Sequence, residues 1–296
     1  MVKIPVFAPT TTETWGFCHL KHELASIERW VPVQFGKRDL APYLGRAFAA
    51  AMAALNFDKL PSRDASAPSP LSPTDAPPIV ASRAFVGEIE ALRAAGVQIM
   101  QDDVDESAAA LGRGVEKYLA NDPLIESNGW HVQDVELTLP NHGRARIDWG
   151  GLDPDGVLCQ VDYKLKLNLD AKWYSKEVER YRYSNQMWHY CWGYGEHKQQ
   201  PVNRYYVCLV VLSPRFSVKA HPYEVDPELL AAWRTSAEQK WRDMDAQKEG
   251  LRIPDMASVH RDAYGDCIYQ RACLELKLDP ALMSVAYVQL PRREHE

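Results

Sequence analysis

Two extended runs separated by a turn sequence constrain the fold of this chain more than any other feature. Residues 145–149 and 157–165 are rich in apolar and β-branched side chains, and the segment between them is rich in Asp, Pro and Gly. Such turn residues between two extended runs predict a β-hairpin. An amphipathic stretch follows at 171–193, so the pattern indicates a hairpin that leads into a helix.

Three charged side chains interrupt the hairpin strands, at Asp148, Asp162 and Lys164. Asp162 and Lys164 are two residues apart, so their side chains leave the same face of an extended strand. Asp148 joins that face only if the loop has five residues or one strand carries a bulge, because a four-residue loop would place it opposite Val161. Glycines in and beside the turn allow either geometry. We therefore expect an irregular hairpin.

In that register the two carboxylates lie on neighbouring strands, with Cβ atoms about 5 Å apart. They repel each other unless a cation lies between them, and oxygen ligands of this kind suit Mg²⁺ or Mn²⁺. A lysine beside the ion would hold an attacking hydroxide or offset charge on a phosphoryl transition state. The pattern predicts metal-assisted hydrolysis of a phosphodiester.

An Asp-x-Lys sequence alone is common as a solvated pair on an edge strand, so the interpretation depends on its context. Part of that context is the pair Gln186 and Tyr190, which are four residues apart and share one face of the following helix. The simpler alternative for this pair is an ordinary amphipathic face with a buried tyrosine.

Together, Asp148, the sequence VDYK at 161–164 and the sequence QMWHY at 186–190 resemble the PD-(D/E)XK nuclease superfamily. The similar branch is the RecB-like one, which includes phage, CRISPR-associated and AddB-type exonucleases. The resemblance implies an α/β fold with a restriction-endonuclease-like core, in which helices flank a mixed central β-sheet, with helical N-terminal and C-terminal additions. It also implies that the lysine of the first motif is catalytic and that the glutamine and tyrosine of the second support the site and the DNA strand.

The same resemblance implies a metal site made by Asp148, Asp162 and the backbone carbonyl of Tyr163. In RecB-like nucleases a Gly-x-x-His helix adds a metal-binding histidine, but here the position three after Gly45 is Phe48. Either the site works with carboxylates, carbonyl and water alone, or another residue replaces the histidine.

Two glutamates are candidates for that replacement, namely Glu116 in a predicted helix and Glu136 in a predicted strand. Each also fits an ordinary surface charge.

The six cysteines fall into two groups. Cys159, Cys191 and Cys208 lie in apolar segments and are expected in the core. The others, Cys18, Cys267 and Cys273, resemble part of the four-cysteine set that holds a [4Fe-4S] cluster in AddB-like and phage relatives. The position expected for the fourth ligand is Tyr264, and His19 or His260 are alternatives. The competing interpretation is a degenerate set that packs as ordinary core.

The formal net charge of −6 argues against a protein that binds nucleic acid through its overall charge, but it allows a local basic groove. Basic residues interleaved with aromatic residues surround the proposed site, as in channels for single-stranded DNA. The candidate DNA-binding residues are Arg144, Arg146, Lys166, Lys172, Lys176, Arg180 and Arg182. A solvated helix face is the alternative for each.

With 296 residues, 46% of them apolar, the chain is long enough for one large or two small domains. It contains neither an apolar run of membrane-spanning length nor a signal peptide, so we expect a cytoplasmic protein without a membrane partner. The sequence predicts a helical region at 1–60, a Pro/Ser-rich disordered or extended linker at 61–81, a nuclease core at 82–213 with its catalytic hairpin at 144–165 and helix at 171–193, and a strand, helix and Cys-containing tail at 214–296.

The resulting hypothesis is an Mg²⁺- or Mn²⁺-dependent deoxyribonuclease of phage or mobile-element type. It would be an exonuclease that acts on linear DNA ends, including single-stranded ones, for recombination or end processing, with a single-strand annealing or recombination protein as partner. The alternative is a catalytically inactive protein of the same fold that binds DNA or assembles with other proteins. A hydrolase of another phosphorylated substrate is also compatible with the site residues.

Overall fold

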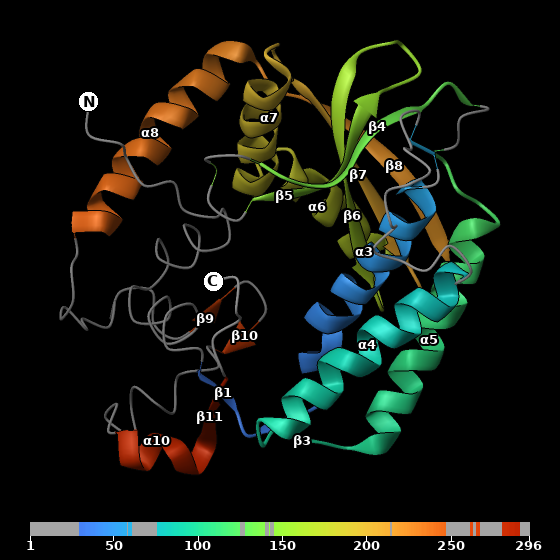
Figure 1. Cartoon of the computed structure of the whole chain (residues 1–296), viewed down its shortest axis with the longest axis vertical. Helices are drawn as coiled ribbons and strands as arrows, with labels where there is room; N and C mark the ends of the chain where they lie inside the picture. The colour runs from blue at the N-terminus through green and yellow to red at the C-terminus, as the bar shows by residue number, and fades with distance from the viewer. Residues whose placement is uncertain are drawn as a thin grey trace, which may run out of the picture.

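A mixed five-stranded sheet lies at the centre of the described chain, in the strand order β4-β5-β6-β7-β8 (Figure 1). Its strands are β4 (His131–Thr138), β5 (Arg146–Leu152), β6 (Leu158–Lys166), β7 (Arg204–Val211) and β8 (Ser217–Glu224). Strands β6 and β7 are parallel, and the other neighbours are antiparallel. The predicted α/β class with a mixed central sheet is confirmed.

The computed structural model describes residues 30–57, 59–60, 76–124, 128–139, 142, 145–213, 215–246, 261–262, 265–266 and 280–290. Several predicted features lie outside these residues: the candidates Cys18, Cys267, Cys273, His19, His260 and Arg144, and the linker from 61 to 75. No helix in the described part of the chain has an apolar stretch long enough to cross a lipid bilayer.

Helices cover both faces of the sheet (Figure 1). They are α3 (Ala41–Phe57), α4 (Pro77–Ala94), α5 (Gln101–Leu119), α6 (Ala171–Tyr181), α7 (Asn185–Lys198), α8 (Pro227–Ala246) and α10 (Pro280–Ala286), with a short 3-10 helix, η2 (Lys37–Leu40). Helices α3, α4 and α5 pack together on one face, and α7 covers the other. Because both faces are covered, β7 is buried along almost its whole length, as its continuous apolar sequence predicts.

Three pairs of short strands complete the described chain. They are β1 (Trp30–Pro32) with β11 (Tyr287–Gln289), β2 (Gln34–Phe35) with β3 (Gln98–Ile99), and β9 (Arg261–Asp262) with β10 (Gly265–Asp266). The prediction that the N-terminal region is largely helical is therefore wrong for residues 30–35. The β-branched Val31 and the imino ring of Pro32 favour extended backbone there over a helix.

Two further predictions differ from the structure at helix boundaries. Helix α4 begins at Pro77, so residues 77–81 form its first turn instead of the end of an extended linker. Proline suits this place because the first helical N–H groups need no partner within the helix. The single helix expected at 171–193 is divided into α6 and α7, because Ser184 accepts a hydrogen bond from the Met187 N–H and caps a new helix.

The predicted hairpin has a five-residue loop, which is one of the two geometries that the sequence allows. Leu152 pairs with Leu158 and Trp149 with Val161, so residues 153–157 form the loop. Asp153 organises this loop: its Oδ1 accepts hydrogen bonds from the N–H groups of Asp155 and Val157, both at 3.0 Å. Gly156 has a φ of +75°, which a glycine adopts without strain.

Gly150 and Gly151 bring neighbouring elements close to β5. A Cβ atom on Gly150 would lie 2.3 Å from the Tyr194 ring of α7, and one on Gly151 would lie 2.0 Å from the carbonyl oxygen of His131 in β4. Helix α7 can therefore pack directly on β5, and β4 on its other edge, only because both side chains are absent.

Candidate active site

Asp148 lies where strands β5 and β6 stop pairing. The ladder ends at Trp149 and Val161, although β6 continues to Lys166. Beyond that pair, the Tyr163 N–H donates to Asp148 Oδ2 at 2.7 Å instead of to the backbone of β5. A carboxylate thus occupies the place of a backbone acceptor, and the two strands diverge around it.

The same geometry directs the carbonyl of Tyr163 toward Asp148. The N–H and C=O of one strand residue leave the strand on the same side, so the Tyr163 carbonyl also faces the gap between the strands. The side chain of Tyr163 leaves through the opposite face, where its hydroxyl accepts hydrogen bonds from Asn56 Nδ2 at 2.9 Å and Trp149 Nε1 at 3.1 Å. These bonds fix the backbone of β6 at the site.

Asp162 and Lys164 lie together on the α7 face of β6, as their spacing predicts. Lys164 Nζ is 2.7 Å from Asp162 Oδ2, and it donates a hydrogen bond to Gln186 Oε1 at 3.1 Å. Gln186 Nε2 donates to the Tyr190 hydroxyl at 2.8 Å. Four of the predicted site residues therefore form one connected chain of polar contacts.

The start of α7 and one contact with β6 place the helix so that this chain can form. The Ser184 cap starts the helix immediately before Gln186, and Gln160 Nε2 contacts the sulfur of Met187 at 3.6 Å. Gln160, Asp162 and Lys164 alternate with core residues along β6, so all three face α7.

Burial raises the pKa of both aspartates, and at Asp148 the charge of Asp162 raises it further. Loss of solvent is the largest cause at Asp148, and the charge of Asp162 is the next. Burial also raises the pKa of Asp162, whereas the neighbouring Lys164 lowers it in part. Burial, and then the charge of Asp162, raise the pKa of the Tyr190 phenol. The site therefore concentrates negative charge in a poorly solvated place, which a cation would relieve.

Of the two glutamates proposed as extra ligands, only Glu136 lies beside the site. Glu136 lies on β4 between the cross-strand pairs Val135–Trp149 and Leu137–Ile147. It is therefore opposite Asp148 on the neighbouring strand β5. Its φ of +50° is unusual for a residue with a side chain. Its carboxylate pairs with Arg146 at 2.8 Å.

Glu116 has a different position from the one proposed. It lies on an exposed part of α5, and α5 packs on the sheet face opposite to Asp162 and Lys164. The proposed role of Glu116 as a metal ligand is therefore not supported, because an exposed helix residue on the other face cannot reach the carboxylates.

Phe48, at the position where the RecB-like pattern would place a histidine, also lies on the far face of the sheet. Its buried ring makes edge contacts with Tyr118, at 5.8 Å between ring centroids, and with Tyr163, at 6.3 Å. Tyr163 points away from the face that carries Asp162. A histidine at position 48 would therefore enter an aromatic core rather than approach the carboxylates.

The donor set fits a hard divalent ion. Asp162 Oδ2 is buried and, although Lys164 Nζ is near, makes no hydrogen bond of good geometry with the described residues. Two carboxylates and a carbonyl would leave room for the several waters that Mg²⁺ retains. Among the described residues, no group of three or more His, Cys, Asp and Glu side chains is placed to hold a metal ion, so backbone and water ligands would be required.

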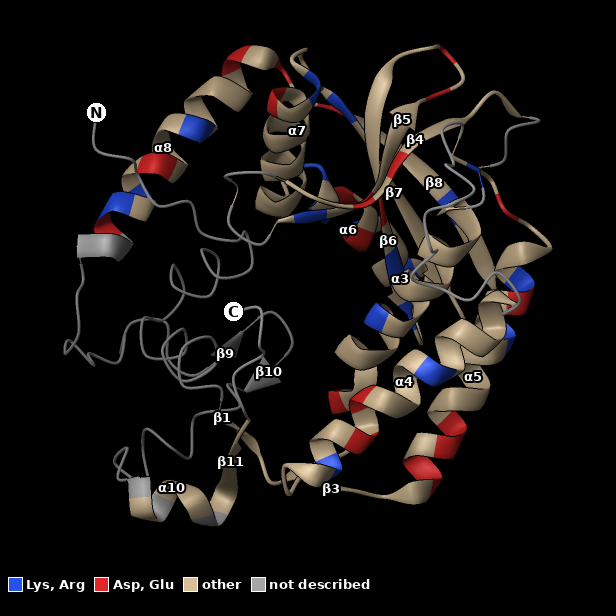
Figure 2. Cartoon of the chain, viewed as in Figure 1, with Lys and Arg blue, Asp and Glu red and all other residues tan. Residues whose placement is uncertain are grey.

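Most of the predicted DNA-binding residues already have acidic partners. Ion pairs join Arg146 to Glu136, Lys166 and Arg180 to Glu177, and Arg182 to Glu179. On α6, Lys172 and Lys176 are exposed one turn apart. Lys176 Nζ lies 4.5 Å from the ring centre of Trp173, whose side chain is 54% exposed. Helix α6 thus presents a ring and two ammonium groups to solvent. Figure 2 shows that the ribbon of α6, beside β6, carries both basic and acidic positions.

The structure also shows a supporting residue that sequence reasoning missed. Asp153 is buried, and its Oδ2 accepts from Arg204 at 2.7 Å and from the Tyr206 hydroxyl at 2.9 Å. Burial alone would raise its pKa, but hydrogen bonds from Arg204, Val157 and Tyr206 bring that pKa below the ordinary value. The Asp-Pro-Asp-Gly turn was the available signal, because a first Asp in such a turn often bonds to backbone N–H groups.

The three cysteines expected in the core, Cys159, Cys191 and Cys208, are buried as free thiols. The cysteines proposed for a cluster lie outside the described residues. No model of a known protein family matches the chain, and no curated protein matches its sequence.

Proposed function

We propose that the protein is a metal-dependent deoxyribonuclease with a restriction-endonuclease-like core, in which Mg²⁺ or Mn²⁺ binds between β5 and β6. The observation that carries the proposal is the interruption of the β5-β6 ladder at Asp148, beside Asp162 and Lys164. A regular hairpin would be more stable without these charges, because buried like charges oppose folding. Their presence together at a gap in the sheet supports a functional site.

The ion would be held by Asp148, Asp162 and the carbonyl of Tyr163, and when bound it would supply Lewis acidity to a phosphodiester oxygen. Lys164 is positioned by Gln186 and Asp162, and its ammonium group would hold the attacking water or stabilise negative charge that develops on the phosphoryl group. Tyr190 keeps Gln186 in the orientation that accepts from Lys164, because its hydroxyl takes the amide N–H.

DNA is the proposed substrate because the exposed Trp173 and the ammonium groups of Lys172 and Lys176 lie on α6, directly after the catalytic strand. Stacking on an aromatic ring and contact with phosphates are the two elements of single-strand binding. We therefore place the activity at linear DNA ends, in recombination or end processing.

A second candidate is a catalytically inactive DNA-binding protein of the same fold. The direct contact between Lys164 and Asp162 favours it, because an ion pair of this kind would neutralise Asp162 without a metal. It predicts DNA binding without metal-dependent cleavage.

End-labelled linear DNA incubated with Mn²⁺ or Mg²⁺ distinguishes the two candidates. We expect degradation by the wild type and a loss of at least about 100-fold in Asp162→Asn and Lys164→Ala. Matched controls are Asp243→Asn and Arg242→Ala, both at exposed positions on α8 away from the site, which should retain activity. Equal activity of site variants and controls would refute the nuclease, and DNA binding without cleavage by the wild type would favour the second candidate.

A further inference from the structure

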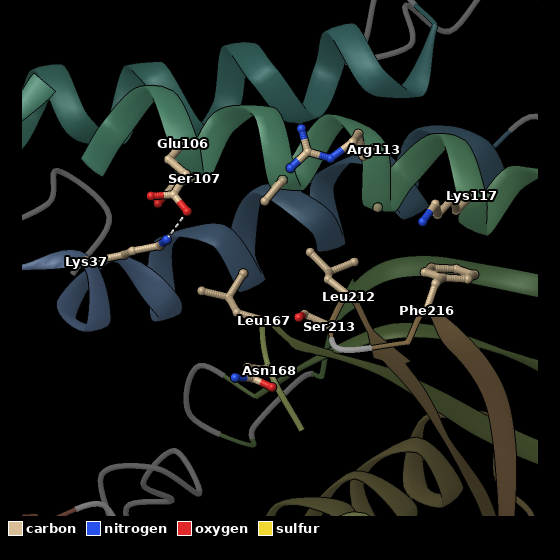
Figure 3. A pocket seen from close by; sticks show the side chains of 12 residues that line it. Lys37, Glu106, Ser107, Arg113, Lys117, Leu167, Asn168, Leu212, Ser213 and Phe216 are labelled. Carbon is tan, nitrogen blue, oxygen red and sulfur yellow. Dashed lines mark ion pairs between the residues drawn. The ribbon is translucent and has the colours of Figure 1, made fainter. Parts of the chain in front are cut away.

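A cavity of about 580 Å³ lies between α5 and the ends of β6 and β7 (Figure 3). Leu167 and Asn168 reach it from the end of β6, and Leu212, Ser213 and Phe216 reach it from the segment between β7 and β8. The leucines and Phe216 pack against the core on the α3-α5 side of the sheet, so the cavity opens on the face opposite to Asp162 and Lys164. It is therefore separate from the candidate active site.

The floor of the cavity is formed by the segments that follow the carboxyl ends of the parallel strands β6 and β7, and two backbone hydrogen bonds hold it. The Leu212 N–H donates to the Lys166 carbonyl at 2.9 Å, and the Leu169 N–H donates to the Ser213 carbonyl at 3.0 Å. These bonds tie together the segments that follow β6 and β7. In α/β proteins the space beyond the carboxyl ends of adjacent parallel strands is a common place for a ligand. The volume lies within the range typical of small-molecule sites.

The charge around the cavity is positive at one end. Lys37 and Glu106 form an ion pair, so their charges offset each other (Figure 3). Arg113 and Lys117 remain, four residues apart on α5 and thus on one helical face. On a chain with a formal charge of −6, two adjacent cations facing a cavity favour an anionic ligand.

One of these cations lies over an aromatic ring. Lys117 Nζ is 5.4 Å from the centre of the Phe216 ring, and both residues line the cavity. An aromatic face and an ammonium group at this distance suit a ligand that carries a planar ring and a negative charge together.

Ser107 adds a buried polar group to the wall of the cavity. The residue is only 1% exposed, it lines the cavity, and its hydroxyl oxygen has no hydrogen-bond partner among the described residues. A buried hydroxyl without a partner is costly unless a ligand or water satisfies it.

We propose that this cavity binds a mononucleotide. Arg113 and Lys117 bind its phosphate, the edge of the Phe216 ring contacts its base, and Asn168 offers hydrogen bonds to its polar edges. The mononucleotide site goes beyond the proposed nuclease activity and does not depend on it, because none of its residues belongs to the β5-β6 gap. Since the ligand would contact the end of β6, the strand that carries Asp162 and Lys164 would link the two sites.

Calorimetric titration of the full chain with AMP and dAMP, in buffer with a chelator, tests the proposal. We expect one saturable site for each nucleotide, with adenosine and inorganic phosphate each binding at least about tenfold more weakly because each lacks one half of the contacts. Lys117→Gln and Phe216→Leu should each weaken nucleotide binding by about tenfold. Thermal unfolding of both variants confirms that they are folded.

Two control variants test whether the nucleotide binds at this cavity and not elsewhere on the protein. Arg242→Gln changes an exposed arginine on α8, away from the cavity, and should bind as the wild type does. Asp162→Asn should also bind normally, whether or not it has lost nuclease activity. The proposal is overturned by absence of saturable binding up to about 1 mM, which would be weaker than a specific small-molecule site. It is equally overturned if Lys117→Gln and Phe216→Leu leave binding unchanged, if Asp162→Asn abolishes it, or if phosphate alone binds as tightly as AMP.

Discussion

Replacement of Asp148 by asparagine should make the metal-free protein more stable at neutral and alkaline pH. The asparagine carbonyl can still accept the hydrogen bond from the Tyr163 N–H, but the side chain carries no charge. Burial, followed by repulsion from Asp162, raises the pKa of Asp148 from 3.8 to about 8. The wild type must ionise this carboxyl in an unfavourable place, and the variant has no such requirement.

The direction of the pH dependence follows from the raised pKa. A carboxyl that holds its proton more tightly in the folded state favours folding at low pH, and that advantage is lost as the pH rises through the folded-state pKa. Each unit of pKa difference corresponds to about 1.4 kcal/mol. Asp148 is partly exposed and Lys164 is near, so the variant should gain less than half of the free energy that the whole pKa shift represents. We expect a gain of about 2–3 kcal/mol in the free energy of unfolding at pH 8.

Thermal unfolding in the presence of a chelator measures the effect. A gain of about 2–3 kcal/mol corresponds to a rise in Tm of about 5–10 °C for a chain of this size. The gain should disappear below about pH 3, where the wild-type carboxyl is protonated in both states. With Mn²⁺ at about 100 times its Kd, the wild type should gain about 2.7 kcal/mol, and the variant should gain little.

Asp243→Asn is the matched control, since it removes an exposed carboxylate and should change neither the Tm nor its response to metal. A wild type that is insensitive to Mn²⁺, or an Asp148→Asn variant that is less stable than the wild type at pH 8, would refute the argument that the two carboxylates are held together for an ion.

Three further variants test the framework around the site. Gly151→Ala should destabilise the protein by at least about 3 kcal/mol in urea unfolding, because its Cβ would lie 2.0 Å from the His131 carbonyl oxygen; a loss below about 1 kcal/mol would show that β4 can move away. Asp153→Ala should cost about 2–4 kcal/mol by the same measurement, since Arg204 and two backbone N–H groups lose their acceptor, and an unchanged midpoint would contradict that role. Tyr163→Phe should cost about 1–2 kcal/mol and lower activity with it, because two buried donors lose the hydroxyl; unchanged stability would mean that water replaces it.

The sequence predicted the sheet and the hairpin because their signals are local. Alternating apolar residues identify β6, and the spacing of Asp162 and Lys164 places both on one face of it. The turn sequence alone does not distinguish a five-residue loop from a bulge. The contact of Asp153 with Arg204 supports the loop, and these two residues are far apart in the chain. Register depends on such long-range contacts as much as on the turn itself.

Helix placement was less predictable for the same reason. Ser184 lies within a continuous amphipathic pattern that does not reveal its capping role. The sequence therefore predicts one helix where the structure has two. The position of Phe48 could not be derived from its motif either, since only the packing of α3 shows that its ring meets Tyr163 on the face away from the carboxylates.

The Tyr163 N–H bonds to the side chain of Asp148 instead of to the backbone of β5. This bond limits how far the stability of the sheet can be increased. A substitution that allowed β5 and β6 to pair along their full length would give the Tyr163 N–H a backbone carbonyl as its acceptor. The hairpin would then be more stable. The substitution would also close the opening into which the two acids project. A sheet made more rigid at that point would therefore lose the proposed metal site, so we expect the opening to persist as a trade-off between stability and the proposed activity.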